Sequence, residues 1–337
     1  MEKDEQQLSV KTEINEVQDA IVEAMPEIMG EMGSLFGFDP RRIPKSVYRQ
    51  MKSRLKSYFK VIEPMVAAGE DYVPNFDDFE RLIGAGLKLG GTRLRKGVSP
   101  VDWLIAHQQK QVSPQPALVR HNPDYMRAYT AVSEFADVVL AELGPDFDEL
   151  GREWNRTPEP RKLMAVVRGW NDNTLDFPEP KPTRFTERQL ERMANTYRSV
   201  AAFWEMRLRF FVWILRKMRG KHVPPAKMVR VPLAHLVQEV ESFPTLAPLA
   251  GFLNVQVRNA LAHGRADRQR ATEVCVFHDS ANPVKWTCDE FWGNTAKLLT
   301  AAPTLGYLEV MVQLRLFRLV VAGLREADVP SIAQDAG

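Results

Sequence analysis

Cysteine and long apolar runs are both scarce in this chain of 337 residues. The two cysteines, Cys275 and Cys288, cannot build a disulfide framework, and their spacing matches no metal site. The longest apolar stretch is broken by the charged residues Glu309, Arg315 and Arg318. No segment therefore approaches the roughly 20 apolar residues that a membrane-spanning helix needs. The acidic first ten residues are unlike a secretory or transit peptide. We therefore expect a cytoplasmic protein that makes no contact with a membrane.

Most familiar catalytic motifs are also missing. The sequence has no GxxxxGK[ST] phosphate loop, no GxSxG nucleophile elbow, no HExxH and no CxxC. Three histidines have no ligand-spaced partners and are expected to be ordinary surface or core residues: His107, His121 and His278. We expect neither a metal nor an organic cofactor.

The net charge of +2 hides an uneven distribution. Residues 1–180 hold 23 Lys and Arg against 29 Asp and Glu, whereas residues 181–337 hold 22 against 14. The basic second half raises the expectation of an anionic partner, nucleic acid first among them. The uninterrupted basic residues from Arg41 to Lys60 leave double-stranded DNA binding open as a further reading.

Helical periodicity dominates the whole chain. Apolar residues recur at helical spacing over residues 14–28, 45–66, 76–89, 101–109, 123–143, 187–218, 233–242, 246–262, 288–300 and 304–327. A capping box of Thr186 and Gln189 predicts the start of the longest helix. Two short β-branched and aromatic runs predict one hairpin, over residues 272–277 and 284–287.

A proline-rich stretch, Thr157–Thr183, separates two helical regions. We place the domain boundary inside it, which gives a helical N-terminal domain over residues 1–180 and a second domain over residues 181–337. The fold class predicted from these patterns is all-α with one short hairpin.

One short segment carries residues suited to chemistry, Val257–Gly264, with the sequence VRNALAHG. Arg258 and His263 flank four residues near the expected end of a helix, and Gly264 suits a left-handed cap. Spacing alone is weak evidence, because Arg216 with His222 and Arg230 with His235 satisfy the same loose Arg-x(4–6)-His pattern. Only the pair of Arg258 and His263 has an Asn directly after the arginine and a Gly directly after the histidine.

The segment resembles the R-N-x-x-A-H core of HEPN domains, a helical group with many RNA-cleaving members. The resemblance covers about residues 185–325 and implies a HEPN-type helical bundle. HEPN nucleases are similar to one another in working without metal as homodimers, with two motif copies facing each other. By resemblance, Arg258, Asn259 and His263 would be catalytic. A tyrosine that one antitoxin-paired subgroup carries two residues after the histidine is replaced here by Arg265.

The residue types suit metal-free RNA cleavage. A histidine can take the 2′-hydroxyl proton near neutral pH, and an arginine can hold the charged phosphate. On one ideal helix, however, Arg258 and His263 point about 140° apart. Either the helix unwinds near Gly264 or a second subunit contributes to each site.

Neighbouring charged residues complete the expected site. The basic side chains after the motif are candidates for substrate binding, namely Arg265, Arg268 and Arg270. Glu205 and Arg209 form an i, i+4 pair on the long helix. That pair is either a structural ion pair or a support that orients the motif.

These observations lead to two hypotheses of different kinds. The first is a homodimeric, metal-independent endoribonuclease that leaves 2′,3′-cyclic phosphates, acting as a toxin or in phage defence, with RNA as substrate and an antitoxin or sensor protein as a further partner. The second is a non-catalytic HEPN-like module for dimerisation or binding. The acidic first helix could cover the basic second half and inhibit it.

Overall fold

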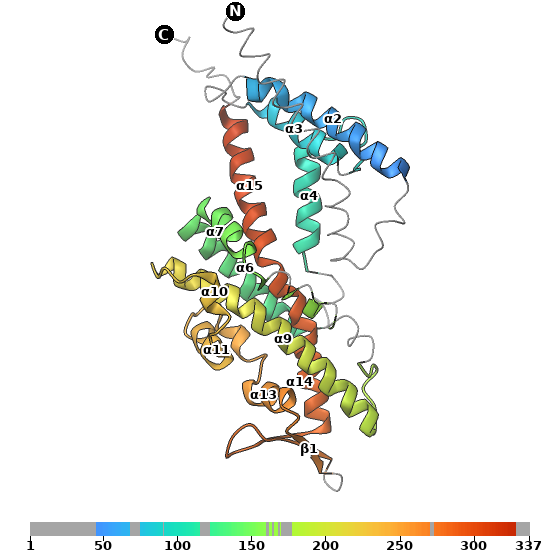
Figure 1. Ribbon diagram of the computed structural model, residues 1–337, viewed down its shortest axis with the longest axis vertical. Coiled ribbons are helices and arrows are strands. Elements are labelled where there is room, and N and C mark those ends of the chain that lie inside the picture. The colour runs from blue at the N-terminus through green and yellow to red at the C-terminus, as the bar shows by residue number, and fades with distance from the viewer. Residues whose placement is uncertain are drawn as a thin grey trace, which may run out of the picture. The chain divides into compact units, whose positions relative to one another are not determined.

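The structure is a computed structural model that describes residues 45–67, 75–89, 91–114, 122–159, 162–163, 165–167, 169, 177–269 and 273–327 (Figure 1). The described chain is mostly helical and includes one small antiparallel sheet. The all-α fold class with a short hairpin is therefore confirmed at this coarse level. The helix expected over residues 14–28 lies outside the described residues. Within the described residues, no helix combines the length and apolarity needed to cross a bilayer.

The described residues group into two compact units. The first unit contains α2 (Lys45–Ala67), α3 (Phe76–Leu89), nearly all of α4 (Pro100–Val112) and the end of α15 (Leu308–Ala327). In this unit α2 packs on α3, and Phe79 contacts Phe317 with ring centroids 5.6 Å apart. These helices match the ranges expected from periodicity to within four residues.

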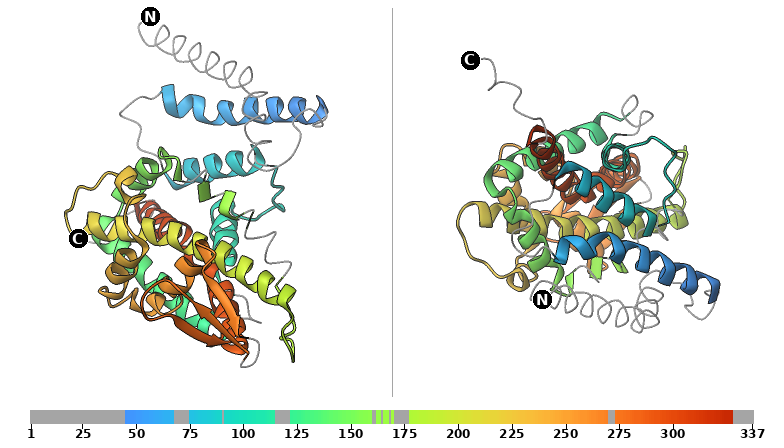
Figure 2. Two further views of the ribbon diagram at one scale, coloured as in Figure 1. Left: turned by 60° about the horizontal axis from the view of Figure 1, so that its bottom comes forward. Right: turned by 90° about the horizontal axis from the view of Figure 1, so that it is seen from above.

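The second unit, Val112–Leu316, is built around the long helix α9 (Glu187–Met218). Its N-terminus has the predicted capping box, in which Thr186 and Gln189 bond each other's backbone N–H groups. Around α9 lie α6 (Pro123–Leu143), α11 (Leu233–Glu241), α13 (Val255–Ala262) and α14 (Cys288–Ala301) (Figure 2). Because neighbours surround α9, Phe210 and Phe211 are almost fully buried, and each such burial contributes about 1.5–3 kcal/mol.

The boundary expected near residue 180 falls inside this second unit. Helix α6 and helix α7 (Asp146–Asn155) precede that boundary, yet both pack on α9, which follows it. Phe135 of α6 contacts Phe211, and Trp154 of α7 contacts Phe210, with ring centroids 5.7 and 5.2 Å apart. Residues on both sides of the proline-rich stretch therefore share one hydrophobic core.

Two local features differ from the expectations. The helix expected over residues 246–262 is two helices, α12 (Ala247–Ala250) and α13, because Phe252 and Leu253 turn into the core between them. Asn254 then starts α13 by accepting a hydrogen bond from the Val257 N–H at 3.0 Å. The expected hairpin, β2 (Val274–Phe277) and β3 (Val284–Thr287), also gains a third strand, β1 (Ala266–Gln269), which pairs with β2.

The remaining elements connect these parts. Helix α10 (Pro225–Met228) follows α9, and the short 3₁₀ helix η3 (Ala302–Gly306) joins α14 to α15. Helix α14 begins with a second capping box, formed by Thr287 and Glu290. It packs on β2, β3 and α9, so the sheet, α13 and α14 form one end of the second unit (Figure 1).

Candidate functional site

Helix α13 presents the motif and ends just before its histidine. Ala260 and Leu261 are buried, whereas Arg258 and Asn259 are half-buried. The Gly264 N–H donates to the Leu261 carbonyl, and the Arg265 N–H donates to the Ala260 carbonyl at 2.8 Å. This double contact with Gly264 at φ +64° is a Schellman cap, as the glycine predicted.

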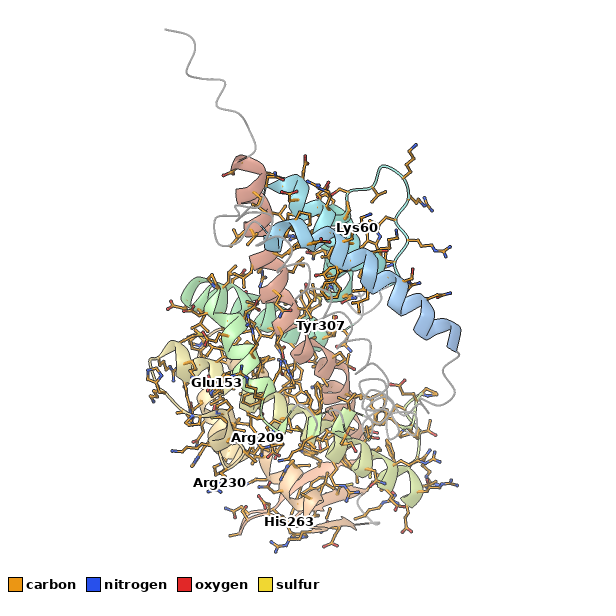
Figure 3. The ribbon with its side chains drawn as sticks, turned by 45° about the horizontal axis from the view of Figure 1, so that its top comes forward. Lys60, Glu153, Arg209, Arg230, His263 and Tyr307 are labelled. Carbon is orange, nitrogen blue, oxygen red and sulfur yellow. The ribbon has the colours of Figure 1, made fainter. Side chains whose placement is uncertain are left out.

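The cap changes where His263 lies relative to the helix. His263 is the C-cap residue, with φ −100° and ψ 6°, and so no longer follows ideal helical geometry. Its side chain is exposed at the end of the unit that carries the sheet (Figure 3). Among the described residues, the His263 imidazole has no hydrogen-bond or ion-pair partner. Its imidazole is therefore exposed and not held by any other described side chain.

Arg258, in contrast, is held in place by other side chains. Its Nη2 donates to Glu205 Oε2 of α9, and its Nη1 donates to Asn259 Oδ1 at 3.2 Å. The Arg258 side chain is 26% exposed and that of Glu205 only 12%. The guanidinium has further N–H groups beyond these two contacts. Arg258 is therefore oriented by a buried carboxylate while part of its edge faces outward.

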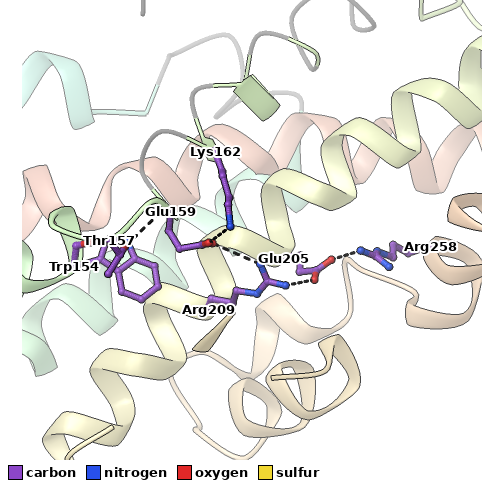
Figure 4. Close-up of polar contacts among 7 residues, drawn as sticks. All are labelled: Trp154, Thr157, Glu159, Lys162, Glu205, Arg209 and Arg258. Carbon is purple, nitrogen blue, oxygen red and sulfur yellow. Dashed lines mark hydrogen bonds and ion pairs between the residues drawn. The ribbon is translucent and has the colours of Figure 1, made fainter. Parts of the chain in front are cut away.

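Glu205 belongs to a longer series of charges (Figure 4). Its other oxygen, Oε1, accepts from Arg209 Nη2 at 2.5 Å, and Arg209 Nη1 lies 3.6 Å from Glu159 Oε2. Lys162 Nζ donates to Glu159 Oε1 at 3.1 Å. We call these five residues, Lys162, Glu159, Arg209, Glu205 and Arg258, the charge chain. The structure thus joins both expected supporting residues, Glu205 and Arg209, to Arg258.

Glu159 was not among the residues expected at the site. It lies between Pro158 and Pro160, in the stretch that looked like a linker, yet its side chain is only 2% exposed. Nothing in the local sequence indicates that this carboxylate packs against Arg209. A buried charge is costly unless it is paired, and the charge of Glu159 is paired with Lys162 and, at a longer distance, with Arg209.

A second unexpected carboxylate contacts the motif from the sheet. Asn259 Nδ2 donates to Asp279 Oδ2 at 3.0 Å, two residues beyond the end of β2. The same contact settles the orientation of the Asn259 amide, whose oxygen accepts from Arg258. Asn259 therefore links Arg258 to the sheet, and it is a positioning residue in this arrangement.

The three arginines expected to bind substrate differ in their surroundings. Arg265 is exposed next to His263. Arg268 is engaged: its Nη2 donates to the Phe185 carbonyl at 2.9 Å and to both carboxylate oxygens of Glu273. The hydrogen bond with Glu273 raises the pKa of Arg268 and lowers that of Glu273. Arg270 lies outside the described residues.

The two cysteines are buried, Cys275 in β2 and Cys288 at the start of α14. Cys275 and Cys288 are free thiols whose sulfur atoms are 4.0 Å apart. Burial, with a smaller effect of Cys288, raises the pKa of the Cys275 thiol to about 12. A thiol in this state is a poor nucleophile. In the part of the chain that the structure describes, no group of three His, Cys, Asp or Glu side chains could hold a metal ion.

The geometry therefore brings Arg258, Asn259, Glu205 and Arg209 into one bonded set and leaves His263 and Arg265 exposed beside it. Comparisons of the chain with protein-family models, with curated proteins and with solved structures give no match.

Proposed function

We propose that the chain is a metal-independent endoribonuclease of HEPN type, with its catalytic residues in α13 and at its C-terminal end. One observation carries this proposal. Within one short segment, Arg258 is fixed by a buried carboxylate, whereas the His263 imidazole is exposed and without a partner among the described residues. Metal-free RNA cleavage requires both a fixed cation that binds the phosphate and an accessible base that takes the 2′-hydroxyl proton.

The proposed reaction is a transesterification. His263 takes the proton of the ribose 2′-hydroxyl, and the 2′-oxygen attacks the adjacent phosphorus. The bond from phosphorus to the 5′-oxygen then breaks, which leaves a 2′,3′-cyclic phosphate and a 5′-hydroxyl. The outward N–H groups of Arg258 bind the non-bridging oxygens as negative charge gathers on them. Arg265 contributes a positive charge for the RNA backbone.

The test is cleavage of total RNA by the purified chain in the presence of EDTA. New 5′ ends should accept phosphate from a polynucleotide kinase without phosphatase treatment. His263→Ala should lower the rate by about 10²-fold or more. His235→Ala is the matched control, because His235 is an exposed histidine from one of the two look-alike pairs. Undiminished cleavage by a double variant, Arg258→Lys with His263→Ala, would contradict the proposal.

We also propose a homodimer, because facing motif copies would allow Arg258 and His263 from different subunits to act on one phosphate. Mixing the separate Arg258→Lys and His263→Ala variants tests this arrangement. If each site combines both subunits, mixed dimers contain one intact site and recover part of the activity. Sedimentation as a monomer at concentrations where RNA is cleaved would contradict the dimer.

The rival function is a non-catalytic module for dimerisation or binding. It is favoured by the engagement of Arg258 in the charge chain, a contact that a purely structural arginine would also make. Removing Arg258 would leave Glu205 less well paired and cost stability under either function. His263 therefore discriminates better: the rival predicts no RNA turnover at all. For the endoribonuclease, we further propose a cytoplasmic role as a toxin or in phage defence, with an antitoxin or sensor protein as partner.

A further inference from the structure

A carboxylate–histidine pair lies on the sheet beside the motif. Asp267 Oδ2 of β1 is 3.1 Å from His278 Nε2, and His278 directly follows β2. The two side chains are 79% and 46% exposed, respectively, so the pair faces solvent. From the sequence, His278 seemed an ordinary histidine without a partner. The partner comes from β1, the strand that periodicity did not predict.

Strand pairing brings this histidine next to the motif. The His278 N–H donates to the Arg265 carbonyl at 2.9 Å, which continues the ladder in which Ala266 pairs with Phe277. Two Cα–Cα steps and one strand pair put the Cα atoms of His263 and His278 at most about 13 Å apart. The next residue along, Asp279, contacts Asn259 of the motif directly. The segment that carries His278 is thus bonded both to Asn259 of the motif and to Arg265, the residue that follows the motif.

The sheet also directs the side chains to one side. Residues two apart on a strand share a face. Arg265 directly precedes β1 and continues its ladder through the bond with His278, so we expect it to lie on the same side as Asp267. His278 lies opposite Arg265 and reaches Asp267 as a diagonal neighbour. One face of the sheet therefore presents a cation, an imidazole and its carboxylate next to the end of α13.

We propose that His278 is the second catalytic residue of this site and protonates the 5′-oxygen as it leaves. The inference rests on the proposed ribonuclease function. His263 gains the 2′-hydroxyl proton, the bond between the 2′-oxygen and phosphorus forms, and the bond to the 5′-oxygen breaks. The proton of His278 moves to that oxygen. Exchange with water then returns a proton to His278 and removes one from His263, so both residues are restored.

Asp267 has a defined part in this step. Because its carboxylate bonds Nε2, the Nδ1–H of a protonated His278 is left to face the substrate. Asp267 is accordingly a positioning residue, and its loss should matter less than the loss of His278.

The experiment compares two leaving groups. An RNA oligonucleotide is cleaved with the natural 5′-oxygen or with sulfur in its place at the cleaved linkage, since a thiolate leaves without protonation. His278→Gln should lower cleavage of the natural linkage by about 10²-fold and cleavage of the sulfur linkage by only a few-fold. Asp267→Asn should show the same pattern with a smaller loss. His263→Ala should be defective on both substrates, and His235→Gln on neither.

Two results would overturn the inference while leaving the ribonuclease intact. One is an unchanged rate of His278→Gln on the natural linkage. The other is an equal loss on both linkages, which would assign His278 to binding or folding. Failure of the unmodified chain to cleave RNA would instead remove the proposed function, and this inference with it. Because His278 is exposed, thermal melting of the variants should match that of the unmodified chain.

Discussion

The end of α9 and the end of α13 are two versions of the same local arrangement. Arg216 near the end of α9 pairs with Glu239 of α11, and Arg258 on α13 pairs with Glu205 of α9. A glycine at positive φ follows each helix, Gly220 and Gly264, and an exposed histidine lies beside each. The spacing of arginine and histidine therefore does not distinguish them.

What differs is the environment of the carboxylate. Glu239 is 25% exposed and serves one arginine, whereas Glu205 is 12% exposed and lies between Arg209 and Arg258. Beyond Arg209 the series continues to the buried Glu159. The comparison teaches that connection to a buried charge network, rather than spacing, sets the motif apart.

The largest difference is expected when each carboxylate is removed. Glu205→Ala removes the carboxylate that the largely buried Arg209 and Arg258 share. The free energy of unfolding should therefore fall by about 3–5 kcal/mol. Glu239→Ala should cost only about 1 kcal/mol, because that pair is more exposed. Urea denaturation of both variants measures the contrast. Equal losses would mean that the two arrangements do not differ in the way described.

The next effect concerns the far end of the charge chain. Glu159→Gln keeps the shape of the side chain but removes its charge, and should cost about 1–3 kcal/mol because Arg209 loses one of its two carboxylates. The matched control is Glu153→Gln. Glu153 pairs with Lys217 but is 40% exposed, and its variant should lie within about 0.5 kcal/mol of the unmodified chain. A loss confined to the control would contradict the importance of burial.

A smaller effect on stability is expected at the two glycine caps, Gly220 and Gly264, which should differ in their effect on RNA cleavage. Neither glycine has atoms within 4 Å of an added Cβ, so Gly220→Ala and Gly264→Ala should each cost only the backbone strain of positive φ, about 1 kcal/mol. RNA cleavage should fall with Gly264→Ala alone, because only that turn fixes the position of His263. Parallel losses of cleavage in the two variants would argue against the role of the cap.

The smallest effect belongs to the pair of half-buried Arg268 and exposed Glu273. Because Arg268 holds the pKa of Glu273 below its ordinary value, this carboxylate stabilises the fold above about pH 4.3. The contribution is lost as the pH falls through the lowered pKa. The urea midpoints of Glu273→Gln and of the unmodified chain should therefore differ at pH 7 and converge once the pH lies below the lowered pKa. A difference that persists at low pH would point to packing instead.

The sequence predicted what depends on neighbouring residues. Thr186 with Gln189 indicated the start of α9, and Gly264 indicated the end of α13, because caps depend on residues within one turn. The hairpin was predicted for the same reason, from two β-branched runs close in the chain. The fold class and the helix ranges of the described residues follow largely from such local signals.

Features that depend on distant residues were missed. Strand β1 has the sequence ADRQ, with no β-branched or aromatic residue, and forms because β2 offers it a backbone partner. Asp279 contacts Asn259 of the motif from 20 positions away in the chain. Glu159 lies 99 positions before Arg258 and is joined to it only through Arg209 and Glu205. Periodicity carries no information about partners that are distant in the chain. The motif could therefore be found from the sequence, whereas the side chains that bond its residues could not.

The charge chain carries a net positive charge, and this has a consequence for its last member, Arg258. Its five members alternate in sign from Lys162 to Arg258, three positive and two negative, so the inner charges cancel in pairs and one positive charge is left over. Both terminal members are cations, and Arg258 of α13 is the one that belongs to the motif. An anion bound at Arg258 continues the alternation as its next negative member. A singly charged phosphate group bound there, as proposed above, would therefore leave the series neutral as a whole.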